Sequence, residues 1–548
     1  MEADSSFVGL AVSGGVDSMA LAALCSQIQQ TSYLALRTLL QSDYGQNAGD
    51  TPLSRNIKFQ AFVVDHGVRK SSNLEAQAVS KVLEARGIPT QLLKIDWTGH
   101  ETPAELPNFE SLARKYRFQA LGKACRDLGI NSLFLAHHED DQVETVMMRL
   151  IAGHRLAGLM GTHPASEIPE CHGLHGVHES GGIDNAVRDR NRKRLSTSSF
   201  PPSTIATPSL GPLQTEFGGV RVYRPLLQFS KERLIATCRE ERMEWFEDHT
   251  NKDPTVTTRN AIRYMYKNNT LPTVLSKPAI LELSRKSRAK KDTTLEVVNS
   301  WSLKCSVKLA TRTGILRVRF ANLNQFNLDQ LEINGKYAAA LLLRRILMSV
   351  TPQEHVNLSS LVGAVERVFV GSFRAEGLPP PTTAFTVAGL QFKPHVPARL
   401  RHDSESLERC EWLISRQPYM SAAAPPRIEI PANLDASAEP LWSTWNLYDG
   451  RFWIRVQNMA TASMVIRPFR EHDLTSLRYS LSKKHKDLLR DLLRELAPDS
   501  IRWTLPAIAI RDLDGKEKVL ALPTLDVGLP DIEKLVKWEV RYKKVQYG

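Results

Sequence analysis

Ser13-Gly14-Gly15-Val16-Asp17-Ser18 stands between two patterns of different kind. The apolar run at 7–12 before it predicts a buried strand, and the Ala- and Leu-rich segment after it predicts a helix. Two adjacent glycines let the backbone approach a phosphate closely, and the amides at a helix start point at such an anion. The serine hydroxyls can donate to phosphate oxygens, and Asp17 is an oxygen ligand suited to Mg²⁺. These six residues therefore predict a turn that binds phosphate and magnesium.

Two better-known phosphate loops are excluded at this position. The Walker A pattern GxxxxGK[ST] is absent and the turn has no lysine, and the dinucleotide pattern GxGxxG is absent as well. A capped Gly-Gly turn without function is the alternative, but the complete hexapeptide in this strand-to-helix context favours phosphate binding.

Strand and helix patterns alternate through the first 160 residues. Further strand patterns lie at 59–64, 90–95 and 132–136, with helical patterns between them, including one over 108–128. This alternation predicts right-handed βαβ units and a parallel sheet. Because ligands of such sheets bind at the carboxyl ends of the strands, we expect the site to be built from residues 13–18, 65–69 and 137–141.

Composition narrows the class of protein. The chain has 548 residues, with 71 Lys and Arg against 59 Asp and Glu, a net charge of +12. This excess favours a polyanionic partner, although it can also be spread over the surface for solubility. The six cysteines include no CxxC pair, which disfavours a zinc ribbon or iron–sulfur site and fits a reducing compartment. No run of 18 apolar residues occurs, so we expect no membrane partner.

The regular pattern breaks between 163 and 219, where Ser, Thr, Pro, Gly and His are abundant. This composition predicts a disordered insertion. The insertion contains Cys171, His172, His175 and His178, but their spacing does not favour a zinc site. It also contains a basic run at 188–194, for which a solvated stretch of charges is the plainer interpretation. We expect a first domain over 1–270, a mainly helical domain over 271–375, and a strand-containing α+β domain over 376–548.

The other candidate site residues follow the predicted strands or lie on the helices. Asp140, Asp141 and Glu144 share one face of a helix and can bind Mg²⁺ or an ammonium group. For Asp140 alone, an acidic first turn that stabilises the helix dipole is the plainer interpretation. The longer motifs are Asp65-His66-Gly67-Val68-Arg69, Arg114-x-x-Arg117-Phe118, His137-His138-Glu139-Asp140-Asp141-Gln142-x-Glu144, Arg224-Pro225-Leu226-Leu227 and Arg259-Asn260-x-x-Arg263.

These motifs, in this order, resemble those of the tRNA(Ile)-lysidine synthases, which belong to the PP-loop superfamily of N-type ATP pyrophosphatases. The resemblance is strong over 7–165 and 220–270 and weaker over 464–530. Two departures stand out. Residues 152–159 lack the usual Arg-Gly-Ser/Thr-Gly stretch, and Phe118 replaces the usual tyrosine.

The resemblance implies a fold, a reaction and partners. It implies an α/β, parallel-sheet PP-loop ATP pyrophosphatase domain, followed by a helical domain and a smaller α+β C-terminal domain. It implies that ATP, with Mg²⁺, adenylates the wobble cytidine of tRNA-Ile with a CAU anticodon. Free L-lysine then displaces AMP at C2, giving lysidine and a switch to reading AUA. It allows a homodimer, and it implies a mitochondrial location in a eukaryote, although no clear presequence is visible, or a cytoplasmic one otherwise.

Residue chemistry and the resemblance together give the expected site. The arginines are expected to neutralise charge that develops on the phosphates. The expected catalytic residues are His137, Asp140, Asp141, Glu144, Arg114 and Arg117. The expected ATP-binding residues are Ser13, Gly14, Gly15, Val16, Asp17, Ser18, His66 and Arg69. Expected tRNA or phosphate contacts are Arg224, Arg259, Asn260 and Arg263, and the expected metal ligands are Asp17 and Asp141.

Two other functions stay open at this point. A PP-loop tRNA thiolase would be expected to carry paired cysteines or a sulfur-transfer cysteine, and no such pairing is visible. A non-catalytic RNA-binding descendant is the second alternative, against which the intact Asp17, Asp140, Asp141 and Glu144 argue.

Overall fold

The computed structural model describes residues 6–30, 57–68, 72–97, 106, 108–155, 158–183, 211–246, 257–321, 323, 333–373, 383–395, 411–420, 424–434 and 439–545. The chain divides into two compact units. The first consists of residues 1–172, 176–179 and 218–292, and the second of residues 173–175, 180–217 and 293–548. No helix in the described ranges is both long enough and apolar enough to cross a membrane.

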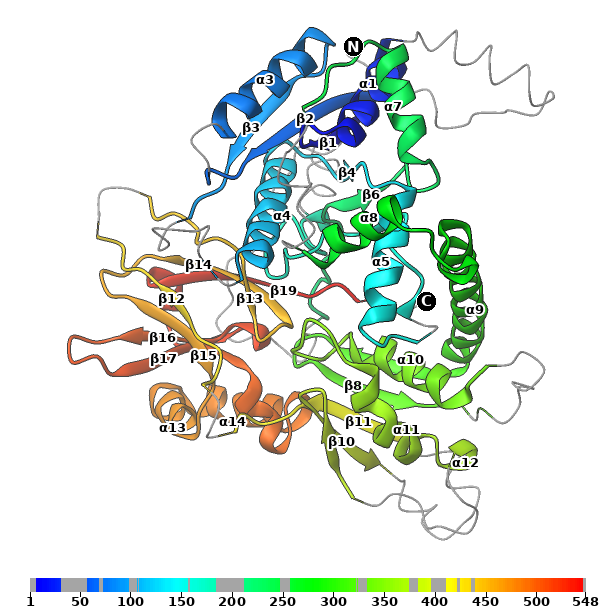
Figure 1. Cartoon of the computed structure of the whole chain (residues 1–548). Helices are drawn as coiled ribbons and strands as arrows, with labels where there is room; N and C mark the ends of the chain where they lie inside the picture. The colour runs from blue at the N-terminus through cyan, green and yellow to red at the C-terminus, as the bar shows by residue number, and fades with distance from the viewer. Residues whose placement is uncertain are drawn as a thin grey trace, which may run out of the picture. The chain divides into compact units, whose positions relative to one another are not determined.

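The first unit is built on one sheet of strand order β3-β2-β1-β4-β6-β5 (Figure 1). Every neighbouring pair in it is parallel except β5 and β6. The predicted parallel α/β fold is therefore confirmed. The strands are β1 (Ser6–Val12), β2 (Ile57–Asp65), β3 (Thr90–Lys94), β4 (Ser132–Phe134), β5 (Ala165–Glu167) and β6 (Arg221–Tyr223). The helices are α1 (Val16–Gln30), α3 (Ser72–Ala85), α4 (Phe109–Asp127), α5 (Glu139–Ile151), α7 (Lys231–Glu240), α8 (Thr258–Asn268) and α9 (Lys277–Lys304), which continues into the second unit.

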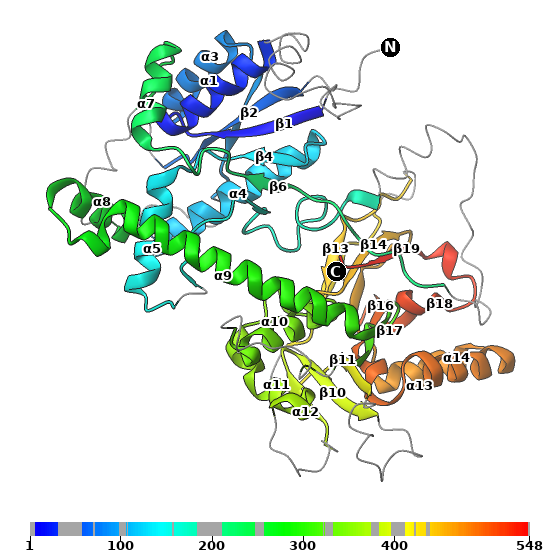
Figure 2. The same cartoon turned by 90° about the vertical axis from the view of Figure 1, so that its right-hand side faces the viewer.

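Alternation along β2 gives each face of the sheet its own core. Phe59, Ala61 and Val63 pack in one cluster with residues of α1, α3 and α7, which lie together in Figure 2. Phe62 points to the opposite face because successive side chains of a strand alternate. A Cβ on Gly9 of β1 would lie 3.0 Å from Phe62 and 3.1 Å from Leu133, so the centre of the sheet has room for glycine there.

The strand order places the site. From β1 the chain proceeds to β2 and β3 on one side, whereas β4 pairs with β1 on the other side. Ligands of open parallel sheets bind at such a reversal, beyond the carboxyl ends of the two strands. The segment after β1 begins at Ser13, and the segment after β4 leads into α5 at Glu139. The two motifs that follow these strands are therefore neighbours in space.

The prediction of a disordered insertion over 163–219 is wrong for its described parts, 163–183 and 211–219. A few well-spaced apolar residues anchor the first part to the catalytic unit: Ile168, Cys171 and Val177 are at most 1% exposed. Cys171 donates to the carbonyl of Phe118 on α4 at 3.4 Å, and β5 extends the sheet. The composition did not reveal these buried residues, because the residues around them are polar. Residues 184–210, including the basic run, lie outside the described residues.

The second part of the insertion belongs to the other unit. Around Thr215 the backbone runs parallel to β19, with Glu216 N donating to Tyr542 O at 2.7 Å and Tyr542 N donating to Gln214 O at 2.8 Å. The buried Glu216 carboxylate accepts from Arg541 and contacts His175, each at 2.9 Å. We call residues 173–175, 180–183 and 211–217 the clasp. The clasp completes the C-terminal unit with residues that precede it in the chain.

Antiparallel sheets build the second unit, as far as its described residues go. Their strand orders are β7-β8-β11-β10-β9, β12-β15-β16-β17-β18 and β13-β14-β19. The first sheet, covered by α10 and α11, takes strands from both sides of residue 375. The boundary predicted there therefore does not separate two sheets, and the expected mainly helical segment contains β7 and β8.

The elements of this unit have the following bounds. The strands are β7 (Ser306–Ala310), β8 (Ile315–Arg319), β9 (Phe385–Val387), β10 (Leu390–His395), β11 (Glu411–Arg416), β12 (Ile428–Ile430), β13 (Asn446–Tyr448), β14 (Phe452–Asn458), β15 (Met464–Pro468), β16 (Pro506–Arg511), β17 (Glu517–Leu522), β18 (Val527–Gly528) and β19 (Val536–Tyr542). The helices are α10 (Gly335–Leu347), α11 (Val362–Val368), α12 (Val370–Phe373), α13 (Glu471–Ser480) and α14 (Lys483–Leu496).

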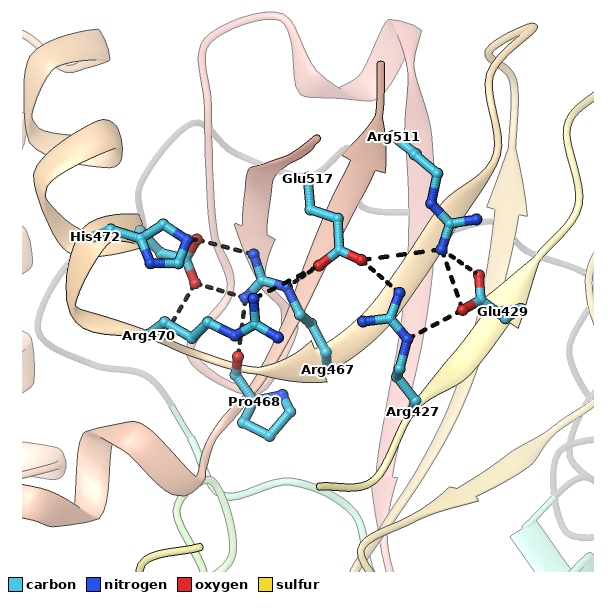
Figure 3. A network of polar contacts seen from close by, with 9 residues as sticks. Arg427, Glu429, Arg467, Pro468, Arg470, His472, Arg511 and Glu517 are labelled. Carbon is cyan, nitrogen blue, oxygen red and sulfur yellow. Dashed lines mark hydrogen bonds and ion pairs between the residues drawn. The ribbon is translucent and has the colours of Figure 1, made fainter. Parts of the chain in front are cut away.

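An ion network fixes the start of α13 to the second of these sheets (Figure 3). The guanidinium of Arg467, which is fully buried, donates to both carboxylate oxygens of Asp473 at 2.6 and 2.9 Å and to Glu517 at 2.7 Å. Asp473 also accepts from the backbone N–H of Arg470 and thereby caps the helix. Burial favours a raised pKa for Glu517, but hydrogen bonds from Arg427 and Arg467 outweigh it and lower the pKa to about 2.

The clasp gives a first prediction. Replacing residues 184–210 by a Gly/Ser linker of equal length should leave the midpoint of urea unfolding unchanged. Glu216→Ala should destabilise the protein by about 3 kcal/mol, because it removes the nearer carboxylate of the buried Arg541 and the acceptor of Gly181 N. Urea unfolding followed by circular dichroism measures both. An unfolding midpoint for Glu216→Ala equal to that of wild type would refute the clasp as a structural element.

The ion network gives a second prediction, concerning pH. Because the folded-state pKa of Glu517 lies below its ordinary value of 4.5, its ionic stabilisation is complete above that pH and declines as the pH falls towards 2. Glu517→Gln should therefore melt at least about 2 °C below wild type at pH 7, for a loss of about 1 kcal/mol. The gap should close as the pH falls below 4.5. A gap that does not depend on pH would contradict this assignment.

Candidate active site

The turn after β1 is held by its own polar groups. Ser18 Oγ donates to the carbonyl of Gly15 at 2.9 Å and accepts from Ser13 N at 3.2 Å. Ser18 is only 5% exposed, so its hydroxyl closes the turn, in contrast to the phosphate contact expected for it. Val16 is also buried and begins α1, so its side chain belongs to the core. Hydrogen bonds within the turn itself therefore hold its shape.

Gly14 is the residue on which this shape depends. Its φ is +85°, a conformation that residues with a Cβ rarely adopt. A Cβ at this position would lie 2.7 Å from Val79 Cγ2 of α3. Gly14 O accepts from Phe246 N at 2.9 Å, which fixes the peptide on its other side. Gly15, by contrast, has room for a Cβ, with its nearest neighbour at 3.8 Å.

His138 joins the motif after β4 to the turn after β1. It is the N-cap of α5, where its Nδ1 accepts from Asp140 N at 3.2 Å and its own N–H donates to Asp141 Oδ2 at 3.0 Å. Its Nε2 lies 3.4 Å from Asp17 Oδ2 and 3.6 Å from Asp141 Oδ2. The two expected metal ligands therefore meet on one imidazole.

Neighbouring charges set the protonation of this pair. Burial favours a raised pKa for Asp17, but the hydrogen bond from His138 and the charges of Lys231 and Arg263 outweigh it and lower the pKa. Lys231 Nζ lies 3.7 Å from Asp17 Oδ2. Burial disfavours the His138 imidazolium, but Asp17 and Asp141 outweigh burial and raise the pKa of His138. Asp17 is therefore a carboxylate at neutral pH.

Two arginines pair with Glu144, a further carboxylate of the motif. Arg263 of α8 donates to both oxygens of Glu144, at 2.5 and 3.1 Å, and Arg259 pairs with the same carboxylate at 3.1 Å. Burial raises the pKa of Glu144 despite Arg263. Asp140 pairs separately with Lys277 at 2.7 Å. In this state the structure thus gives Glu144 and Asp140 cationic partners from α8 and α9, where the sequence predicted contacts to substrate.

A second group of site residues is basic. Burial lowers the pKa of Arg117, and the like charges of Arg114 and Arg259 lower it further. Burial and Arg117 likewise lower the pKa of His66. Burial also lowers the pKa of His137, to about 4; Asp141 opposes this shift, and Arg224, Arg259 and Arg117 add to it. These cations and neutral imidazoles are close enough to affect one another, which is the environment that an anion with several charges requires.

Two members of the basic group have additional structural contacts. Arg224, 8% exposed, donates to the carbonyl of His163 and to Ser166, so its position is fixed by the ordered first part of the insertion. Arg114 is half-exposed, contacts Glu170 at 3.5 Å and lies over the Phe118 ring. His137 Nδ1 is buried and has no hydrogen-bond partner among the described residues.

The structure brings together most of the predicted site and adds three residues. Asp17, Asp141, Glu144, His137, Arg117, Arg259 and Arg263 converge, and Asn260 is buried near the start of α8. Arg69 lies outside the described residues. Sequence reasoning did not assign His138, Lys231 or Lys277. His138 could have been found as the residue before an acidic helix start, whereas neither lysine belongs to a motif.

The carboxylates fit Mg²⁺ in the way that nucleotide enzymes bind it. Asp17 Oδ1 is buried and has no hydrogen-bond partner within the described ranges, so an acceptor is left over at this edge. No group of three His, Cys, Asp or Glu residues there can hold a metal alone. Mg²⁺ is commonly bound by one or two carboxylates plus substrate phosphates and water, which matches Asp17 and Asp141.

Comparison with known proteins agrees with this geometry. A family model described as a PP-loop domain matches residues 2–178 and 192–269, which include the turn, α5 and α8. This match covers just under half of the chain, so the chain contains a region that is similar to PP-loop domains. The region lies mostly in the first unit and includes parts of the insertion.

Full-length similarity extends beyond the PP-loop domain. The chain is 27% identical over 523 residues to a Schizosaccharomyces pombe protein named probable tRNA(Ile)-lysidine synthase, covering 94% of this chain and 91% of that protein. A Bradyrhizobium tRNA(Ile)-lysidine synthase is 30% identical over 46% of this chain and 50% of its own length. The chain therefore matches about half the length of that bacterial relative. A U34-tRNA thiolase structure from Methanococcus maripaludis aligns at 16% identity, covering 52% of this chain and 73% of that chain with a TM-score of 0.30, which carries no argument.

The PP-loop turn gives a third prediction. Gly14→Ala should destabilise the first unit by about 2 kcal/mol, because the new side chain must hold a left-handed conformation and displace Val79. Gly15→Ala is the matched control, since a Cβ there meets nothing closer than 3.8 Å. Thermal melting without ligands measures both variants. Equal melting temperatures for the two would contradict the role given to Gly14.

Proposed function

We propose that this chain is a tRNA(Ile)-lysidine synthase. It uses ATP to adenylate the wobble cytidine of a tRNA-Ile with a CAU anticodon, and the ε-amine of free L-lysine then displaces AMP at C2. The coarser statement, modification of tRNA at the expense of ATP, is supported by the PP-loop domain and by the names of the relatives. The choice of lysine and of this cytidine is the finer part of the proposal.

One observation carries the proposal: an acidic half, formed by Asp17 and Asp141, meets a basic half around Arg117 and His137 at the reversal of the parallel sheet. The two halves are close, since Asp141 and Arg117 both act on the charge of His137. Cleavage of ATP between its α- and β-phosphates needs a cation on the phosphates and donors for the charge that develops. The acidic half would hold Mg²⁺, which when bound would shield phosphate charge. The arginines would bind the oxygens of the phosphates.

His137 is suited to a proton transfer in the second step. Its pKa of about 4 keeps the ring neutral at pH 7, and its Nδ1 is an unused acceptor within the described residues. The attacking lysine nitrogen must lose a proton, and Nδ1 can accept one. Nearby arginines disfavour the imidazolium in the ligand-free chain. Bound phosphates would offset those charges and raise the pKa of His137, so that proton transfer becomes easier once ATP is present.

Glu144 and Asp140 would meet the substrate amines only by exchanging partners. Both carboxylates are paired with cations of the chain itself, so a lysine ammonium would replace one of these contacts and keep the charge balance. This exchange differs from binding to an empty acidic pocket, because the buried carboxylate is never left without a cation.

The cysteines give no support to the thiolase alternative. Cys25, Cys125 and Cys171 are buried, and burial raises the pKa of each thiol to about 12. A sulfur-transfer cysteine needs a thiolate near neutral pH. Cys410 lies outside the described residues.

A fourth prediction tests the proposal. Asp17→Asn removes the charge that attracts Mg²⁺ at nearly constant size and should lower pyrophosphate release at least about 100-fold, near 2.7 kcal/mol of barrier. Pyrophosphate release and transfer of labelled lysine are measured separately, with tRNA-Ile of CAU anticodon as substrate and a methionine tRNA as control. Arg490→Gln is a matched control on the exposed side of α14 and should leave pyrophosphate release unchanged.

The outcomes separate the parts of the proposal. Pyrophosphate release at the wild-type rate in Asp17→Asn would contradict the role of this site in ATP cleavage. Lysine transfer to both tRNAs at equal rates, or to neither, would remove the lysidine assignment and leave the ATP-dependent step standing.

A further inference from the structure

His138 differs from Asp17 and Asp141 in two ways. It is a histidine and not a carboxylate, and the sequence analysis gave it no role in binding metal or substrate. It is 3% exposed and contacts both Asp17, which follows β1, and Asp141, which lies on α5. Among the contacts described above, its ring alone joins these two carboxylates. Its position between two expected metal ligands therefore needs an explanation of its own.

The backbone of α5 decides which nitrogen of the ring carries the proton. Asp140 N donates to Nδ1 at 3.2 Å, so Nδ1 must present a lone pair. The ring proton is then on Nε2, an assignment that follows from the hydrogen-bond pattern. Nε2 is the atom that faces Asp17 Oδ2 and Asp141 Oδ2, at 3.4 and 3.6 Å. One ring nitrogen thus lies within 3.6 Å of two carboxylates.

The position of Nε2 bears on the repulsion between the two carboxylates. Two carboxylates that approach each other in a poorly hydrated place repel, and one of them then takes up a proton or turns away. Lys231 and Arg263 offset part of this repulsion, but each lies at 3.7 Å or more from its nearer member of the pair. His138 Nε2 lies nearer to Asp17 than Lys231 does and nearer to Asp141 than Arg263 does, and it contacts both carboxylates.

We infer that His138 is a positioning residue that holds Asp17 and Asp141 together for Mg²⁺ before the metal and ATP arrive. The inference rests on the ATP-dependent part of the proposed function. His138 leaves one Asp17 oxygen, Oδ1, without a partner in the described residues. The imidazole therefore organises the carboxylates while leaving an acceptor for the cation.

Nδ1 caps α5 and Nε2 contacts the two carboxylates, and two substitutions can test these roles separately. His138→Asn keeps an acceptor near the position of Nδ1, so it preserves the helix cap, but it lacks a donor that reaches Asp17. His138→Gln places an amide N–H₂ near the position of Nε2 and gives up the cap. The measurement is binding of ATP at increasing Mg²⁺ by calorimetry, without tRNA or lysine, together with the melting temperature of each ligand-free protein.

A fifth prediction follows for these variants. His138→Asn should raise the Mg²⁺ concentration for half-maximal ATP binding at least about tenfold, a tenfold change corresponding to 1.4 kcal/mol. His138→Gln should change it less than about threefold while losing more of the melting temperature, because an N-cap is worth about 1 kcal/mol. A merely structural role predicts that Mg²⁺ dependence follows the melting temperature in both variants.

Each result decides the matter. A normal Mg²⁺ midpoint in His138→Asn, or a larger shift in His138→Gln than in His138→Asn, would overturn the positioning role. Failure of the wild-type protein to bind ATP at any Mg²⁺ concentration would overturn the proposed function instead, so the two failures are distinguishable.

Discussion

The carboxylates of Asp17 and Asp141 follow two different strands and lie at the same edge of one sheet, where their like charges repel. Several other contacts of the first unit reduce this repulsion. Asp17 follows β1 and Asp141 follows β4, and the strand order makes these positions neighbours. Burial works against both charges. The cap of α5, Lys231 and the arginines of α8 each reduce the cost. The basic residues around His137 complement this arrangement, because Asp141 and the arginines both act on the charge of that ring.

The elements of the PP-loop domain were predictable because local signals agree with one another. The apolar runs at 7–12, 59–64 and 90–95 became β1, β2 and β3 within a few residues, and the helix predicted over 108–128 became α4. The residues after β1 and β4 were expected to lie close together, and they do, since this depends only on the parallel sheet. Asp17 and Asp141 were assigned as a pair for the same reason.

What the sequence could not supply is the partner of each charged group. Glu144 and Asp140 have cations from α8 and α9, more than a hundred residues away in the chain, and no spacing rule reaches that far. Ser18 has the same residue type whether it binds phosphate or closes a turn, and only its contact with Gly15 decides. The insertion was misjudged because composition averages over a segment, whereas Ile168, Cys171 and Val177 act singly.

The clasp also has a bearing on how the chain folds as it is synthesised. Glu216 and Arg541 are separated by 325 positions, so the partner of the clasp is made long after the clasp itself. Until β19 emerges, the backbone around Thr215 has an unpaired strand edge. Contacts between residues so distant in the chain close slowly, and a waiting edge can pair with the wrong strand. The pairing of the clasp with β19 is therefore among the last contacts of the second unit that can form during synthesis, because both partners must first have been made.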